Sequence, residues 1–317
     1  MRCETVHILA PLAQLVEHLT LNQGVQGSSP WRRTEVPIFE LISGVGAFSF
    51  VYNKAKEFTM IFETHAHYDD EAFAEDRDRL LRMLSENGIG RVVNVGASPE
   101  SCRTTIELME KYDFVYGALG IHPSETAALD EALFARLREQ CRHEKCVAVG
   151  EVGLDYYWQE PEREIQKKWF ARQLQLAKEL HLPVVIHSRD AAMDTIEIMK
   201  AEHAEEIGGV IHCFSYTKET AEIFLKMGFY IGIGGVVTFK NAKKLKEAVE
   251  YIPIERIVVE TDSPYLAPEP NRGKRNDSSK LPFVISEIAR IKQLLPEQVE
   301  EITWQNAFQL YRMEKVY

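Results

Sequence analysis

The sequence lacks the features that mark several specialised classes of protein. Its 317 residues contain only five cysteines, scattered at positions 3, 102, 141, 146 and 213, which does not fit a framework of disulfide-stapled loops. No apolar run approaches the roughly 18 to 20 residues that a membrane helix needs. Glu4 lies near the N-terminus and no basic run precedes an apolar core, so a secretory signal is not predicted. We therefore expect a cytoplasmic protein that does not enter a membrane and has no obligate protein partner.

An excess of positive charge is also missing. Lysine and arginine together number 37 against 48 aspartates and glutamates, which gives a formal net charge of −11. Strong non-specific binding to duplex DNA normally goes with a basic surface, so any contact with nucleic acid is expected to be local. The hydrophobic content of 45% and charged content of 27% are ordinary for a globular protein and exclude a disordered or collagen-like chain.

The first 59 residues differ from the rest of the chain. They hold as many basic as acidic residues, and turn-forming residues fill the stretch NQGVQGSSP (22–30). The run QLVEHLTLNQGVQGSSPW (14–31) resembles the translated edge of a structural-RNA gene. We expect residues 1–59 to be an extension, either a gene-model artefact or a poorly ordered segment, and residues 60–317 to form the functional domain. A real regulatory or targeting extension is the alternative.

From Met60 onward, strand-like and helix-like patterns alternate eight times. Several of the strand-like runs are short and almost wholly apolar, as expected of parallel strands that are buried on both faces. They are Ile61–Thr64, Arg91–Gly96, Val115–Ile121, Val147–Val152, Pro183–His187, Gly209–His212, Tyr230–Gly234 and Arg256–Thr261. Eight such units in about 258 residues predict an α/β protein with a (β/α)8 TIM-barrel fold. A doubly wound open sheet is the alternative, but it would normally carry a glycine-rich turn after its first strand, where this chain has histidines.

Candidate metal ligands gather at the ends of the predicted strands. The first strand ends in His65-Ala66-His67, and residues two apart on a strand point the same way. Four further candidates follow other strands: Glu151, His187, His212 and Asp262. In a barrel the carboxyl ends of the strands share one face, which is the face where catalysis occurs.

This set of side chains predicts a metal site at that face of the barrel. Imidazole and carboxylate ligands without cysteine suit Zn²⁺, Mn²⁺ or Mg²⁺, and their number allows two ions. A carboxylate central among four histidines is a natural bridge between two metals. For any one of these histidines, a structural hydrogen bond in the core is the competing interpretation. Agreement at five strand ends favours the metal site.

Several motifs make the resemblance to a family specific. They stand in the order ETHAHYDD (63–70), GIHP (120–123), GEVGLDYY (150–157), HSRDA (187–191), HCFS (212–215), ETDSPYLAP (260–268) and RGKRN (272–276). The chain from Met60 onward resembles the TatD family of metal-dependent deoxyribonucleases, within the amidohydrolase-like barrel superfamily. The resemblance implies one metal held by His65, His67, Glu151 and Asp262. It implies a second metal held by Glu151, His187 and His212.

The site then suggests a mechanism and a substrate. Two divalent ions would activate a water for in-line attack at phosphorus, with Glu151 as the bridge and Asp262 orienting that water or accepting its proton. Arg272, Lys274 and Arg275 form a basic cluster that would bind phosphate oxygens of the substrate. His122 would also contact a substrate phosphate, although a structural hydrogen bond is nearly as good an interpretation.

We therefore expect a deoxyribonuclease or exonuclease that cleaves phosphodiester bonds at the ends of single-stranded DNA. One alternative is an enzyme that uses the same metals to hydrolyse a different bond, namely an amidohydrolase or an aminoacyl-tRNA deacylase. Many such amidohydrolases use a carboxylated lysine as the bridge, where this chain has Glu151. A metal-binding partner protein without activity is the third possibility, and it predicts an incomplete ligand set. Tyr156, Tyr157 and Trp158 follow the bridge and could stack on a base, although packing is the commoner role of such aromatics.

Overall fold

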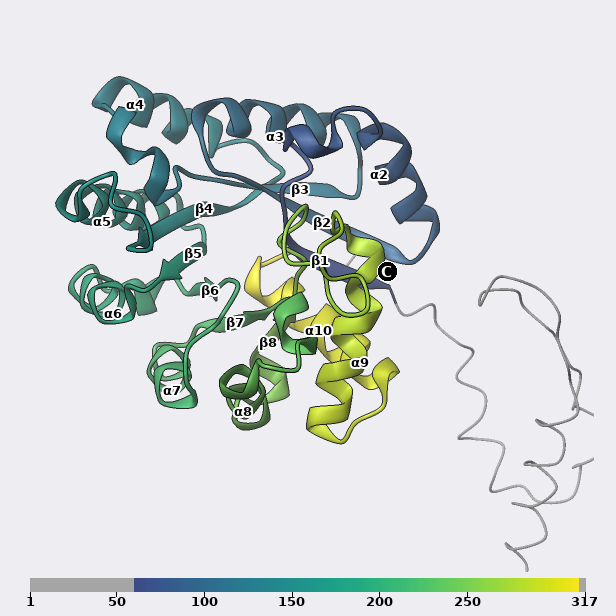
Figure 1. Cartoon of the computed structure of the whole chain (residues 1–317). Coiled ribbons are helices and arrows are strands. Elements are labelled where there is room, and N and C mark those ends of the chain that lie inside the picture. The colour runs from purple at the N-terminus through teal and green to yellow at the C-terminus, as the bar shows by residue number, and fades with distance from the viewer. Residues whose placement is uncertain (1–59, 314–317) are drawn as a thin grey trace, which may run out of the picture. The chain divides into compact units, whose positions relative to one another are not determined.

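The computed structural model describes residues 60–313 (Figure 1). The expectation for residues 1–59 lies outside the described residues, as do residues 314–317. Eight parallel strands form one sheet in sequential order, β1 next to β2 and so on to β8. The strands are β1 (Ile61–Ala66), β2 (Ile89–Gly96), β3 (Val115–Leu119), β4 (Cys146–Asp155), β5 (Val184–Arg189), β6 (Gly209–Ile211), β7 (Tyr230–Ile233) and β8 (Ile257–Val259).

Helices alternate with the strands and form the outer layer (Figure 1). They are α2 (Arg77–Glu86), α3 (Pro99–Lys111), α4 (Glu131–Gln140), α5 (Arg163–Leu180), α6 (Ala192–Ala201), α7 (Lys218–Lys226), α8 (Lys243–Tyr251), α9 (Leu281–Lys292) and α10 (Pro296–Leu310). This arrangement is a (β/α)8 TIM barrel, and it confirms the fold class predicted from the alternation of patterns. All eight predicted strands are present, with ends that differ by a few residues. No helix in the described part of the chain is long and apolar enough to cross a membrane.

Strand β4 is longer than the sequence pattern predicted. It continues past Val152 to Asp155, and all ten of its residues are buried. Gly153, with φ of 144°, allows close contact because a Cβ there would lie 1.9 Å from the carbonyl oxygen of His187 on β5. The extension carries Asp155 into the site.

Hydrogen bonds between the first strand and the end of the last close the barrel. The Thr64 hydroxyl donates to the Val259 carbonyl (2.9 Å), and the Asp262 amide donates to the His65 carbonyl (3.0 Å). A parallel bridge joins Ala66 to Ser263. β1 and the segment after β8 are therefore held side by side.

Two apolar layers support this framework. The larger packs the helices against the outside of the strands. The other combines strand residues such as Val93, Val185 and Val258 with residues of α10. The ring of Phe62 contacts those of Phe308 and Tyr311, at centroid distances of 5.5 and 5.9 Å. α10 therefore packs against barrel residues.

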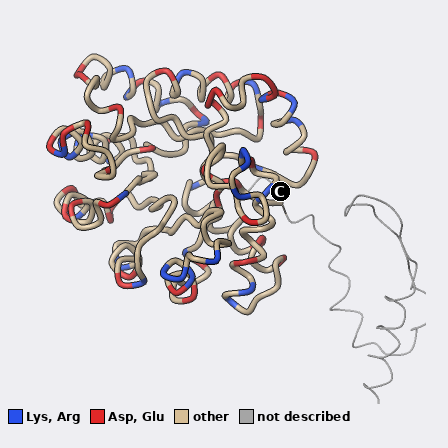
Figure 2. The backbone as a smooth tube through the Cα atoms, in the orientation of Figure 1, with Lys and Arg blue, Asp and Glu red and all other residues tan. Residues whose placement is uncertain are grey.

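The charged residues are spread over the outer helices. Lysines and arginines alternate with aspartates and glutamates along these helices, and neither sign forms a continuous stripe (Figure 2).

Candidate metal centre

The predicted ligands meet around Glu151, which is buried on β4. Its Oε1 lies 2.6 Å from His212 Nε2 and 2.7 Å from His187 Nδ1. Its Oε2 lies 3.6 Å from the Nε2 atoms of both His65 and His67. The two oxygens of one carboxylate therefore face two different pairs of histidines.

Asp262 completes the group on the Oε2 side. Its Oδ1 lies 3.4 Å from His67 Nε2 and 3.7 Å from His65 Nε2. The Asp262 backbone has φ of 55°, a left-handed conformation that aspartate tolerates better than most residues. His65, His67 and Asp262 present ligand atoms within 4.8 Å of one another, as three ligands of one ion do. The sequence predicts these three residues at the ends of the first and the last strand, and the structure brings their side chains together.

Two further groups satisfy the same criterion. One consists of His122, Glu151 and His187, on the Oε1 side. The other consists of His65, His212 and Glu260, all buried. Nδ1 of His65 and Nδ1 of His212 are buried and have no hydrogen-bond partner. The donors are imidazoles and carboxylates without thiolate, so the residues present fit Zn²⁺, Mn²⁺ or Mg²⁺.

The ionisation of the ligands also fits a cation. Burial opposes charge on Glu151, yet His212 and His187 hold its pKa well below its usual range. Burial likewise opposes charge on His67, but Asp262 and Glu151 raise its pKa to about 10. In His65, burial and the neighbouring His212 lower the pKa to about 4. Glu151 is thus held in its anionic form, which is the form of a carboxylate that binds a metal ion.

Asp155 fixes the ring of His187. Its Oδ2 lies 3.1 Å from His187 Nε2, which leaves Nδ1 of that ring facing Glu151. His67 is held similarly, with Nδ1 2.7 Å from the Val95 carbonyl oxygen and Nε2 facing the other ligands. Metal-binding histidines generally use their second nitrogen in this way. Sequence analysis missed Asp155, although its position four residues after Glu151 on one strand was a usable signal.

Two buried glutamates were also missed. Glu63 accepts hydrogen bonds from the His65 amide (3.2 Å), the Thr261 amide (2.9 Å) and hydroxyl (2.7 Å), and the Ser278 hydroxyl (2.8 Å). Glu260 accepts from the Cys213 amide, and burial raises its pKa to about 8. Each is a charged residue inside an apolar strand run, a pattern that requires specific partners. Glu63 joins the segments that carry His65 and Asp262.

The predicted substrate-binding residues occupy different surroundings. His122 Nε2 lies 3.9 Å from Glu151 Oε1, and its Nδ1 accepts from the Ser124 amide (3.2 Å). His122 therefore lies at the edge of the centre, and burial lowers its pKa to about 3. At this position His122 is close enough to act as a metal ligand or to contact a substrate.

The side chains of the predicted basic cluster, Arg272, Lys274 and Arg275, differ in whether they already have a partner within the protein. The guanidinium of Arg275 pairs with Asp76, with donor–acceptor distances of 2.8 and 2.7 Å, and also donates to the Ala72 carbonyl. Arg272 lies over the ring of Phe239, 4.3 Å from its centroid. Lys274 is exposed, and among residues 60–313 its side chain has no ion-pair partner. The sequence did not reveal the Arg275–Asp76 pair because the two residues are 199 positions apart.

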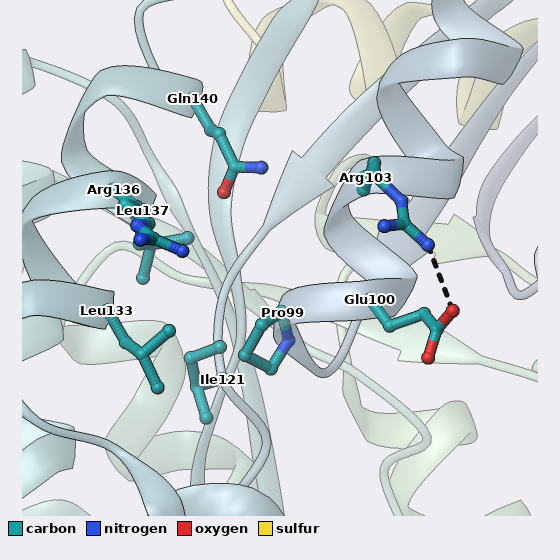
Figure 3. A pocket seen from close by; sticks show the side chains of 8 residues that line it. All are labelled: Pro99, Glu100, Arg103, Ile121, Leu133, Arg136, Leu137 and Gln140. Carbon is teal, nitrogen blue, oxygen red and sulfur yellow. Dashed lines mark hydrogen bonds and ion pairs between the residues drawn. The ribbon is translucent and has the colours of Figure 1, made fainter.

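A separate pocket lies between α3 and α4. Ile121, Leu133 and Leu137 form its apolar wall, and Arg103 at its edge pairs with Glu100 at 2.9 Å (Figure 3). None of the candidate metal ligands lines it. The chemistry therefore belongs to the strand ends and not to this pocket.

Comparison with known proteins agrees with this geometry. Residues 62–312 match the family described as TatD related DNase. The chain belongs to the TatD family. It is 43% identical over 254 residues to the uncharacterized metal-dependent hydrolase YabD of Bacillus subtilis strain 168, covering 80% of this chain and 100% of YabD. It is 35% identical over 257 residues to the uncharacterized metal-dependent hydrolase YcfH of Escherichia coli K12, covering 80% of this chain and 96% of YcfH.

A solved structure supports the same assignment. The TatD homologue YJJV from Escherichia coli K12 superimposes with a TM-score of 0.77 at 27% identity, covering 81% of this chain and 100% of YJJV. The fold, the cluster of ligand residues and the relatives together identify this TatD-family protein as a metal-dependent hydrolase. The resemblance read from the motifs is thereby confirmed.

Proposed function

We propose that this hydrolase is a deoxyribonuclease that uses two divalent metal ions to remove nucleotides from the ends of single-stranded DNA. The observation that carries the proposal is the geometry of Glu151. Its Oε1 is within 2.7 Å of His187 and His212, whereas its Oε2 faces His65 and His67. A carboxylate whose two oxygens serve two ligand groups suits a bridge between two cations.

In this proposal, His65, His67, Glu151 and Asp262 hold one ion, and Glu151, His187 and His212 hold the other. Bound ions would supply Lewis-acid stabilisation of the phosphate oxygens and activation of the attacking water. Asp262 would orient that water or accept its proton. Burial opposes charge on Asp262, but His67 and the neighbouring imidazoles keep its pKa below the usual range, so its carboxylate is anionic and suited to accept a hydrogen bond from the water.

The residues around the centre support a phosphodiester substrate. Arg272 and Lys274 are exposed on the loop after β8, the strand whose end carries Asp262. In the proposal they bind phosphate oxygens of the DNA strand, and His122 contacts a phosphate from the loop after β3. Arg275 contributes only where substrate displaces it from Asp76, because its guanidinium is already paired there.

The test is release of mononucleotides from an end-labelled single-stranded oligodeoxynucleotide. The protein is first stripped with a chelator and then supplied with Mg²⁺, Mn²⁺ or Zn²⁺ in separate reactions. We expect cleavage that depends on added metal and is lost in Glu151→Ala. A duplex, a cyclic amide and an aminoacyl-tRNA serve as competing substrates. Turnover of either of the last two with no release of nucleotides would overturn the proposal in favour of an amidohydrolase or a deacylase.

A further inference from the structure

Two large aromatic side chains stand exposed where β4 ends. Tyr157 is 54% exposed and Trp158 is 58% exposed, although most large apolar side chains in residues 60–313 are buried. Their rings meet edge to face, with centroids 4.8 Å apart and an interplanar angle of 90°. The guanidinium of Arg189, at the end of β5, lies 3.8 Å from the centroid of the Tyr157 ring. Exposed aromatics grouped with an arginine are typical of a binding surface and not of packing.

The neighbouring Tyr156 shows what a packing role looks like in the same segment. Its hydroxyl donates to Asp194 at 2.7 Å, and its ring is covered by Arg163 at 4.2 Å. Neither the Tyr157 hydroxyl nor the Trp158 indole nitrogen has a hydrogen-bond partner among the described residues. The three consecutive aromatics therefore divide into one structural residue and two that present their rings to solvent.

One residue, Asp155, links the backbone that carries the exposed rings to the candidate metal centre. Asp155 accepts a hydrogen bond from the Tyr157 amide at Oδ1 (3.0 Å) and contacts His187 at Oδ2 (3.1 Å). The Tyr156 amide donates to the Arg189 carbonyl (2.9 Å), which joins the ends of β4 and β5. A molecule that lies on these rings is thus positioned by the same carboxylate that positions a ligand histidine.

We propose that Tyr157, Trp158 and Arg189 form a stacking platform for one unpaired base of a DNA strand bound at the metal centre. The proposal rests on the proposed nuclease function and deepens it by assigning a substrate subsite. An aromatic face stacks on any base, so the platform holds a strand without reading its sequence. Bases in a duplex are already stacked on their neighbours, and the platform therefore selects single strands. The positive charge of Arg189 also attracts the strand locally in a protein whose net charge is −11.

The kinetic test compares the wild type with Tyr157→Ala/Trp158→Ala. We expect kcat/KM for a single-stranded oligodeoxynucleotide to fall roughly 5- to 150-fold, chiefly through KM, as loss of one stacking contact predicts. Oligonucleotides that carry an abasic site at each position in turn provide the sharper readout. At one position, loss of the base should weaken binding of the oligonucleotide to the wild type by a similar factor. Loss of the same base should have little effect on binding to the double variant. Tyr251→Ala is the matched control, because Tyr251 is 48% exposed but lies at the end of α8, before β8 begins.

Fluorescence of Trp158 measures the contact without turnover. A phosphorothioate single strand, added to the metal-loaded protein, should quench emission in the wild type and much less in Trp158→Phe. Trp169 is only 4% exposed and makes little contribution to this difference. A duplex of the same sequence should quench less than the single strand.

Failure of the platform and failure of the nuclease function are distinguishable. If the wild type hydrolyses neither the oligonucleotide nor methyl p-nitrophenyl phosphate, the proposed function is wrong, and the quenching experiment still decides the platform. If the oligonucleotide is cleaved but no abasic position discriminates wild type from double variant, the platform is wrong and the nuclease stands. Equal quenching in the wild type and in Trp158→Phe also overturns the platform. That outcome would make a protein partner the better interpretation of the exposed rings.

Discussion

Asp155 and His187 form a pair in which the carboxylate decides which nitrogen of the imidazole faces the centre. Asp155 Oδ2 lies 3.1 Å from His187 Nε2 and so engages one nitrogen of the ring. The other nitrogen, Nδ1, then faces Glu151 at 2.7 Å. The orientation of this ligand therefore depends on a side chain that touches no other candidate ligand at hydrogen-bond distance. Carboxylates in this position also raise the basicity of the histidine.

Asp155→Asn should weaken metal binding on the His187 side. The amide keeps the shape but removes the negative charge, and we expect about 10- to 100-fold weaker affinity for the more easily lost ion. Metal content after dialysis, followed by titration with Mn²⁺, measures the effect. Asp190→Asn is the control, because Asp190 is exposed at φ of 54°, a conformation that asparagine also adopts. Equal metal retention in Asp155→Asn and wild type would contradict the assignment.

Glu151→Gln should lose more metal than His187→Ala. If two ions bind as proposed, the glutamine removes the negative charge of the residue that would bridge them, and their mutual repulsion is then less compensated. His187→Ala leaves His65, His67, Glu151 and Asp262 intact and should empty mainly one position. Elemental analysis of both purified variants measures total metal, and added metal should restore activity better in His187→Ala. A Glu151→Gln protein that retains two ions per chain with near-normal hydrolysis would remove the bridge from the mechanism.

Arg272→Ala/Lys274→Ala should raise KM for single-stranded DNA more than it lowers kcat. The two cations are expected to contact phosphates and not the reacting bond. Each lost phosphate contact should reduce the slope of log affinity against log salt by about 0.7. Arg275→Ala is the comparison, because its charge is already paired with Asp76, and it should change the slope less. A collapse of kcat with unchanged KM and salt slope would show that these residues act elsewhere.

Glu287→Gln should destabilise the fold in a pH-dependent manner. Glu287 on α9 accepts from Arg290 (2.9 Å) and pairs with Lys246 of α8 (2.8 Å), and these partners lower its pKa to about 2 from 4.5. A depressed pKa stabilises the folded state fully above pH 4.5, and this contribution is lost as the pH falls through 2. We expect a loss of about 1 kcal/mol or less at pH 7, since the partners are partly exposed. Urea melts at pH 7, 4 and 3 should show that the difference in unfolding free energy between variant and wild type shrinks as the pH falls. A difference that stays constant over this range would contradict the prediction.

The fold was predictable because the apolar runs in the sequence match the burial that parallel barrel strands require. Apolar runs such as RVVNVG (91–96) and PVVIH (183–187) are long enough for strands and surrounded by helix-like patterns, so the barrel follows from the order of elements. The gathering of the six candidate ligands on one face was predictable for a related reason. Residues at the carboxyl ends of barrel strands share one face, whatever their separation in sequence.

The parts that escaped prediction depend on contacts that no local pattern encodes. Arg275 pairs with Asp76, which lies far away in the chain, and Arg272 lies over Phe239. The sequence shows neither contact, so it predicted a single basic cluster where the side chains have separate partners. The end of β4 escaped because Gly153 interrupts the apolar run and suggests a turn, whereas close packing against His187 requires glycine there. With β4 ended early, Asp155 had no evident role.

Closure of the barrel has a consequence for when the candidate ligand set can be complete during synthesis. His65 belongs to β1 and Asp262 follows β8, so the hydrogen bond from the Asp262 amide to the His65 carbonyl joins the first strand to the segment after the last. A chain synthesised only as far as β7 therefore lacks Asp262 and cannot hold all six candidate ligands. If the protein is the nuclease proposed above, we expect no hydrolysis by a chain that lacks the last strand, because one candidate ligand group combines residues of β1 with Asp262.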